Sequence, residues 1–103
     1  HPLPAHLEAA RAAAGQRSEA VIAAEDWLAA QGVSEWSGPR SLPLWLRDEA
    51  WYGMNARSTE RAAAAGLERR PLESTLADVL GEPVVSGAGL TDEEERELLA
   101  QLR

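Results

Sequence analysis

The chain is 103 residues long, carries a formal charge of −7 at neutral pH and contains no cysteine. This length matches one small domain with a modest core, so we predict a single domain over residues 1–103. The missing cysteine excludes disulfides, thiolate metal sites and a cysteine nucleophile and favours a cytoplasmic location, while the acidic balance argues against binding to the phosphates of nucleic acid.

The first third of the chain carries helix and strand signals. Apolar residues at helical spacing predict a helix over Pro4–Ala14, which Gly15 ends. A β-branched pair within residues 20–23 predicts a short strand. A second helix is expected to open at Asp26 and to end at Gly32, because glycine readily takes the left-handed conformation just past the last helical residue.

Residues 33–52 differ in character, because glycine and two prolines interrupt a run rich in tryptophan and leucine. We predict an apolar loop here. Each tryptophan side chain buries about 150–250 Å² when it packs, so a loop holding Trp36, Trp45, Trp51 and Tyr52 is unfavourable in open water. The loop is therefore expected either to cover the chain's own core or to wall a pocket.

The segment after this loop is expected to be mainly helical. Residues 53–57 predict a second short strand, and Ser58 is expected to cap an alanine-rich helix over Thr59–Ala65. Pro71 opens a further helix over Leu72–Leu80, whose apolar side chains share one face.

The end of the chain combines a loop with a strongly signalled helix. Small residues over 82–89 predict a loop, the most mobile stretch of the chain. Thr91 starts the last helix and forms a capping box with Glu94, in an acidic first turn that the helix dipole favours. Together the elements predict an α+β, mostly helical fold with four to five helices and two short strands.

No complete catalytic set is found in the sequence. A tyrosine followed four residues later by a lysine serves as an acid–base couple in some oxidoreductases, but Tyr52 is followed at that spacing by Ala56, and the chain has no lysine. The Gly87–Gly89 stretch lacks the preceding buried strand of a dinucleotide site. His1 and His6 do not have the spacing of paired zinc ligands on a helix. We predict neither a catalytic residue, nor a metal, nor a cofactor bound by this chain.

Arginine and tryptophan remain as candidates for ligand contact. Guanidinium groups bind carboxylates and phosphates, although for Arg57 and the three arginines that follow it, pairing with the chain's own acidic residues is the favoured role. Tryptophans can stack on ligand rings, although core or interface packing is again favoured. The substrate-side candidates are Trp36, Trp45, Trp51, Tyr52 and Arg57.

The order of the segments carries a resemblance to a known family. Its strongest pieces are LPLWL at Leu42–Leu46 and GLERRPLESTLADVL at Gly66–Leu80, set between VIAAEDWLAAQGV and a terminal GLTDEEERELLAQL. In this order they resemble the carboxy-terminal, substrate-side region of extended short-chain dehydrogenases/reductases, the NAD-dependent epimerase/dehydratase-like proteins. The resemblance implies an α/β Rossmann-type parent enzyme whose other domain binds NAD or NADP, with Leu42–Met54 lying toward its substrate cleft. Ser58 replaces the acidic or asparagine cap that the family often has.

Two functional hypotheses follow from the sequence. In the first, the chain is the carboxy-terminal substrate-binding fragment of an NAD(P)-dependent reductase or epimerase, inactive alone, and its start at His1 is read as a cut. Helix faces bared by the missing domain then predict a homo-oligomer. In the second, it is a free-standing acidic helical module that binds a partner protein or small ligand through the tryptophan-rich loop. Its apolar runs are far shorter than the ~20 residues that span a bilayer, so no membrane contact is predicted.

Overall fold

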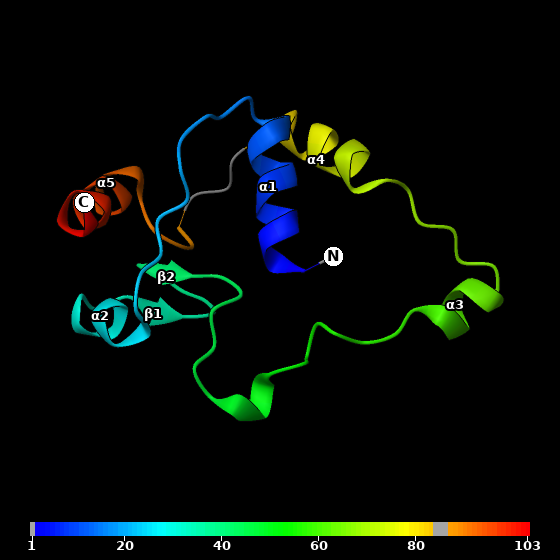
Figure 1. Cartoon of the computed structure of the whole chain (residues 1–103), viewed down its shortest axis with the longest axis horizontal. Coiled ribbons are helices and arrows are strands. Elements are labelled where there is room, and N and C mark those ends of the chain that lie inside the picture. The colour runs from blue at the N-terminus through cyan, green and yellow to red at the C-terminus, as the bar shows by residue number, and fades with distance from the viewer. Residues whose placement is uncertain (1, 84–86) are drawn as a thin grey trace. The chain divides into compact units, whose positions relative to one another are not determined.

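The computed structural model describes residues 2–83 and 87–103. Within these ranges the chain forms five α-helices, one 3₁₀ helix and two strands (Figure 1), which confirms the predicted α+β, mostly helical fold. The elements in chain order are α1 (Leu3–Ala13), α2 (Glu25–Ala30), β1 (Ser34–Glu35), β2 (Ser41–Leu42), the 3₁₀ helix η1 (Glu49–Trp51), α3 (Glu60–Ala64), α4 (Leu72–Leu80) and α5 (Asp92–Leu102).

The elements fall into two compact units, each built from two separate stretches of chain. We call residues 1–19 with 58–84 the helical unit, since it holds α1, α3 and α4. Residues 20–57 with 85–103 form the strand unit, which holds α2, η1, α5 and both strands. The chain therefore passes from one unit to the other three times.

The side chains of the helical unit are largely exposed to solvent. Helix α1 packs against α4 (Figure 1), and each of these helices starts after a proline, Pro2 or Pro71, whose fixed φ suits a helix start. Gly15 ends α1 in the left-handed conformation, with φ +66°. None of the unit's described residues is buried, and Leu7 and Leu80 remain more than half exposed. The unit thus lacks a hydrophobic core of its own.

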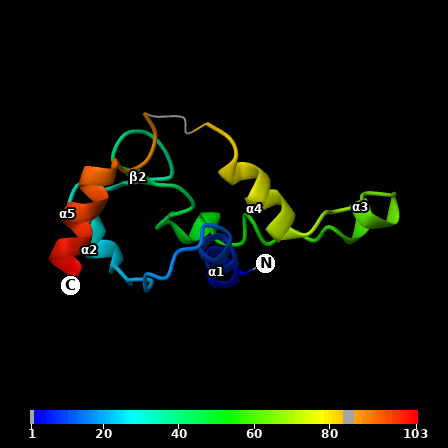
Figure 2. The same cartoon turned by 90° about the horizontal axis from the view of Figure 1, so that it is seen from above.

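The strand unit contains the buried core. Its two strands pair in parallel, Ser34 opposite Ser41 and Glu35 opposite Leu42. Leu28 of α2, Val33 and Leu98 of α5 form the buried cluster, so α5 is held on the same core as α2 (Figure 2). The core is small, which leaves the surrounding loop residues to be positioned mainly by polar contacts.

The capping box at the start of α5 is present as predicted. The Thr91 hydroxyl accepts from the Glu94 backbone N–H at 3.2 Å, and the Glu94 carboxylate accepts from the Thr91 N–H at 2.9 Å. Both bonds satisfy N–H groups that a helix start leaves without partners. The Asp92–Leu102 helix therefore begins at the residue that its sequence signal indicates.

Both predicted strand positions are wrong. In the part of the chain that the structure describes, residues 20–23 form no strand, and Ile22 is 94% exposed. Residues 53–57 turn instead of extending, because the Met54 N–H bonds the Trp51 carbonyl and Gly53 is left-handed at φ +81°. The strands lie inside residues 33–52, the stretch predicted as a loop. There the main chain of Ser34–Glu35 pairs with that of Ser41–Leu42.

The helix predictions hold with small shifts at the ends. The alanine-rich helix begins one residue later than predicted, with Thr59 rather than Ser58 at its N-cap position. The Ser58 hydroxyl still accepts from the Glu60 N–H at 3.2 Å. The predicted loop over 82–89 lies partly outside the described residues. No helix among those the structure describes is both long and apolar enough to cross a membrane.

Candidate functional site

The tryptophan-rich loop is anchored over residues 45–47 by side chains of α2 and β1. The Trp45 indole N–H donates to a Glu25 carboxylate oxygen at 3.2 Å, and the Arg47 guanidinium pairs with Asp26. The Arg47 backbone N–H donates to the Glu35 carboxylate. Three contacts thus fix Trp45–Arg47 against the strand unit and set the position from which the rest of the loop projects.

Beyond this anchor the loop is shaped by consecutive turns. The Asp48 carboxylate accepts from the Ala50 N–H at 2.9 Å and so caps η1. The Met54 N–H then bonds the Trp51 carbonyl at 3.1 Å, and Gly53 supplies the positive φ that the turn requires. Glycine is suited to this position because other residues lose about 1–2 kcal/mol in the left-handed conformation.

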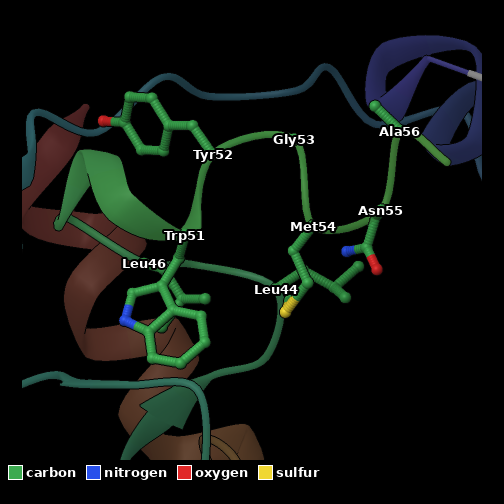
Figure 3. A pocket seen from close by; sticks show the side chains of 8 residues that line it. All are labelled: Leu44, Leu46, Trp51, Tyr52, Gly53, Met54, Asn55 and Ala56. Atoms are coloured by element: carbon green, nitrogen blue, oxygen red, sulfur yellow. The ribbon is translucent and has the colours of Figure 1, made fainter.

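These turns form a pocket of about 330 Å³ within the strand unit (Figure 3). Figure 3 shows Trp51 and Leu46 close together below the loop, Leu44 beside Met54, and the Tyr52 ring pointing away from them. None of the described residues that line it is charged. The lining consists of Leu44, Leu46, Trp51, Tyr52, Gly53, Met54, Asn55 and Ala56. Apolar side chains, two aromatic residues and one amide in an uncharged lining suit a neutral molecule that has both an apolar body and a polar group.

The structure brings together only two of the five predicted substrate-side residues. Trp51 and Tyr52, which are 55% and 61% exposed, both line the pocket. Trp45 is half-buried against the core and uses its indole N–H in the anchor, so its role is structural. Trp36 lies outside the pocket lining, in the turn between the strands, and Arg57 is exposed at the end of the strand unit.

Three non-glycine residues near the strands have a left-handed backbone. They are Trp36 at φ +66°, Arg40 at φ +47° and Leu44 at φ +70°. Such conformations persist only where surrounding contacts impose them, and they cluster at functional sites. Leu44 is itself a pocket residue, so the strained segment leads directly into the pocket wall.

Arg40, like the pocket residue Leu44, was not among the candidates identified from the sequence. Its guanidinium donates twice to the Gln31 carbonyl at the end of α2, at 3.1 and 2.8 Å, and lies 3.5 Å from the Glu94 carboxylate. The hydrogen bond from the Thr91 backbone, with help from Arg40, lowers the pKa of Glu94 below its ordinary value. Arg40 therefore links the end of α2 to the start of α5.

The predicted pairing of the later arginines holds for one of them. Arg70 forms an ion pair with Asp78 and hydrogen bonds to Thr75 and the Ser74 carbonyl. Among the described residues, no cluster of three or more histidine and carboxylate side chains is placed to hold a metal ion.

Two further hollows lie one in each unit. The helical unit has an open hollow of about 630 Å³ beside Arg69, Arg70 and the start of α4. The strand unit has a groove of about 320 Å³ formed by α2, β2, α5 and the segments next to them. Its lining is Val21, Ala23, Trp27, Leu28, Ser41, Leu42, Pro43, Leu90, Glu95, Leu98, Leu99 and Leu102. We call this second hollow the α2–α5 groove.

Comparison with known proteins returned no match. No protein-family model, no curated protein and no solved structure is similar to the chain.

Proposed function

We propose that the chain is the carboxy-terminal, substrate-binding part of a cytoplasmic NAD(P)-dependent reductase or epimerase, and that the Leu44–Ala56 pocket contacts the substrate. Two sequence properties support the proposal: the resemblance carried by Leu42–Leu46 and Gly66–Leu80, and the lack of any lysine or glycine-rich cofactor loop. On this proposal another domain supplies the cofactor and the acid–base couple, and this chain contributes binding surface alone.

The observation that carries the proposal is the exposure of Trp51 at an uncharged pocket. A tryptophan that is 55% exposed beside Leu46 and Leu44 has a large apolar surface in water that a ligand ring would cover. The Asn55 amide in the same lining offers both a hydrogen-bond donor and an acceptor. Together these groups favour a neutral substrate with an apolar body and one polar end, such as a ketone or alcohol.

Binding of a model carbonyl compound tests the role of the pocket. Acetophenone, a neutral ketone with an aromatic ring, is expected to give saturable ligand-observed NMR signals with the chain, whereas NADH gives none. Trp51→Ala should abolish the acetophenone signal. Trp36→Ala, the matched change outside the pocket, should leave it intact. Equal binding by the Trp51→Ala protein would refute the site.

The gene that encodes the chain tests the parent enzyme separately. A glycine-rich loop and a Tyr-x-x-x-Lys pair encoded upstream of His1 would support a short-chain dehydrogenase/reductase parent. An open reading frame of only this length, starting at its own methionine, would refute the parent and leave the pocket result unaffected.

A partner protein is the second candidate, favoured by the direction of Tyr52. Its ring is 61% exposed and points away from the other pocket side chains (Figure 3). Exposed Tyr and Trp are typical anchors of protein interfaces. In that case Tyr52→Ala would weaken partner binding more than it weakens acetophenone binding.

We also propose that the chain self-associates through the helical unit. No described residue of that unit is buried, while Leu3, Leu7, Val79 and Leu80 each keep about half or more of their side chain exposed. Exposed apolar side chains favour association where they gather into a patch. A light-scattering mass equal to one chain at micromolar concentration would contradict this proposal.

A further inference from the structure

The α2–α5 groove differs in chemistry from the Leu44–Ala56 pocket. Ten of its twelve lining residues are apolar, and its floor is formed by Leu28 and Leu98 of the buried cluster. The two hollows share no lining residue. A ligand in this groove would therefore rest on the core of the strand unit, independently of the proposed substrate site.

The two polar residues of the groove, Ser41 and Glu95, differ in whether their side chains are hydrogen-bonded. The Ser41 hydroxyl donates to the Gly38 carbonyl at 2.6 Å, so it is already used. The Glu95 carboxylate, by contrast, makes no hydrogen bond or ion pair with any of the described residues. Among the described residues that line this mostly apolar groove, Glu95 is thus the one ionisable group.

The surroundings of Glu95 strengthen its preference for a positive ligand. The strand unit holds ten acidic side chains against five arginines, and three of the acidic residues directly precede Glu95 in the first turn of α5. Trp27 lines the same groove, and an indole face attracts organic cations. Both features act against an anionic ligand.

The volume of the groove sets the size of the ligand. At about 320 Å³ it is near the lower limit for small-molecule sites and has room for about ten water molecules at about 30 Å³ each. An aryl or short alkyl body fits this space, whereas a dinucleotide does not.

We propose that the α2–α5 groove binds small organic ammonium ions whose apolar body rests on Leu28 and Leu98 and whose charge faces Glu95. The proposal commits to a primary or substituted ammonium group carried on an aryl or alkyl body. It goes beyond the proposed function, which places substrate contact in the Leu44–Ala56 pocket and assigns no ligand to this groove.

The test compares a cation with its neutral counterpart. Phenethylammonium and 2-phenylethanol share the same aryl body and differ in the ammonium and hydroxyl groups. We expect phenethylammonium to shift the NMR signals of the Trp27 indole N–H and the Leu99 methyl groups saturably. Its affinity should be about three- to fivefold higher than that of 2-phenylethanol, the size typical of a pair with an exposed carboxylate such as Glu95. Half-molar salt should remove this preference.

Two substitutions in the same helical turn distinguish an effect of the groove carboxylate from an effect of the overall negative charge. Glu95→Gln should lower phenethylammonium affinity to that of 2-phenylethanol and leave 2-phenylethanol binding unchanged. Glu93→Gln, which makes the same charge change outside the lining, should retain most of the preference. Circular dichroism of both variants checks that α5 remains folded.

Three results would overturn the proposal. They are equal affinity of the unmodified chain for both compounds, equal losses in the Glu93→Gln and Glu95→Gln proteins, and shifts confined to Trp51 with none at Trp27. None of these results affects the acetophenone test of the Leu44–Ala56 pocket.

Discussion

Arg40 offers the most informative perturbation, because it combines a strained backbone with a specific side-chain contact. Its guanidinium donates two hydrogen bonds to the Gln31 carbonyl, and its side chain is 30% exposed. Hydrogen bonds that involve a charged group contribute about 1.5–3 kcal/mol, and partial exposure places this one near the lower limit. Arg40→Ala is therefore expected to lower the free energy of unfolding of the strand unit by about 2 kcal/mol.

Arg40→Gly provides the matched comparison. A non-glycine residue at φ +47° costs about 1–2 kcal/mol, and glycine avoids this cost. Glycine also makes the unfolded chain more flexible, which lowers the stability by up to about 1 kcal/mol and so offsets part of the gain. The glycine protein loses the same hydrogen bonds but relieves the strain. It should therefore be more stable than the alanine protein by about 0.5–1 kcal/mol, the reverse of the order that a glycine substitution usually gives.

Urea unfolding followed by tryptophan fluorescence measures both differences, since all four tryptophans belong to the strand unit. Arg57→Ala is the control, because Arg57 is exposed and makes no side-chain bond with the described residues. The reasoning fails if Arg40→Ala costs no more than Arg57→Ala, or if the alanine protein is more stable than the glycine protein.

Three further predictions follow from the same structure. Leu98→Ala removes one of three buried core side chains and should lower the free energy of unfolding, measured in urea, by about 2–5 kcal/mol. Leu80→Ala, on an exposed face, should lower it by less than about 1 kcal/mol. Similar losses for the two variants would contradict the core assignment. Gly53→Ala should cost about 1 kcal/mol because of the positive φ, and Gly53→Asn less, since asparagine tolerates this conformation; the opposite order would show that the turn is different. The hydrogen bond from Thr91 lowers the pKa of Glu94 in the folded chain below 4.5, so the stability it gives is present above that pH and is lost as the pH falls through the folded value. Glu94→Gln should therefore flatten the fall in thermal midpoint as the pH drops below 4.5, and an unchanged slope would exclude this role.

The helices were predictable because their signals are local. Pro71 and Gly81 enclose α4, and the Thr91 capping box sets the start of α5, all within a few residues of chain. Strand pairing has no such local signal. The β-branched pair at 20–23 lies beside no partner, while Ser34 and Ser41, without strong β propensity, pair because the turn between them brings them together.

The candidate site was predictable in its aromatic content but not in its geometry. Trp51 and Tyr52 were identifiable as large aromatic side chains, which are expected to pack on the core or to line a pocket. The Trp45–Glu25 contact and the two-point contact of Arg40 with Gln31 join residues 20 and 9 positions apart, with no shared periodicity to indicate them. Their discovery required the folded backbone.

The interleaved order of the two units has a consequence for how the chain acquires its structure. The core of the strand unit joins Leu28 and Val33 to Leu98, so it must close a loop that contains residues 58–84. Leu98 lies 65 positions beyond Val33, and closing a loop of that length costs about 4 kcal/mol of chain entropy beyond a constant, which is large for a core of three buried side chains. Replacing residues 58–84 with a short glycine–serine bridge should therefore speed folding of the strand unit and raise its stability, whereas removing residues 1–19 takes away part of the helical unit alone and leaves this loop as long as before.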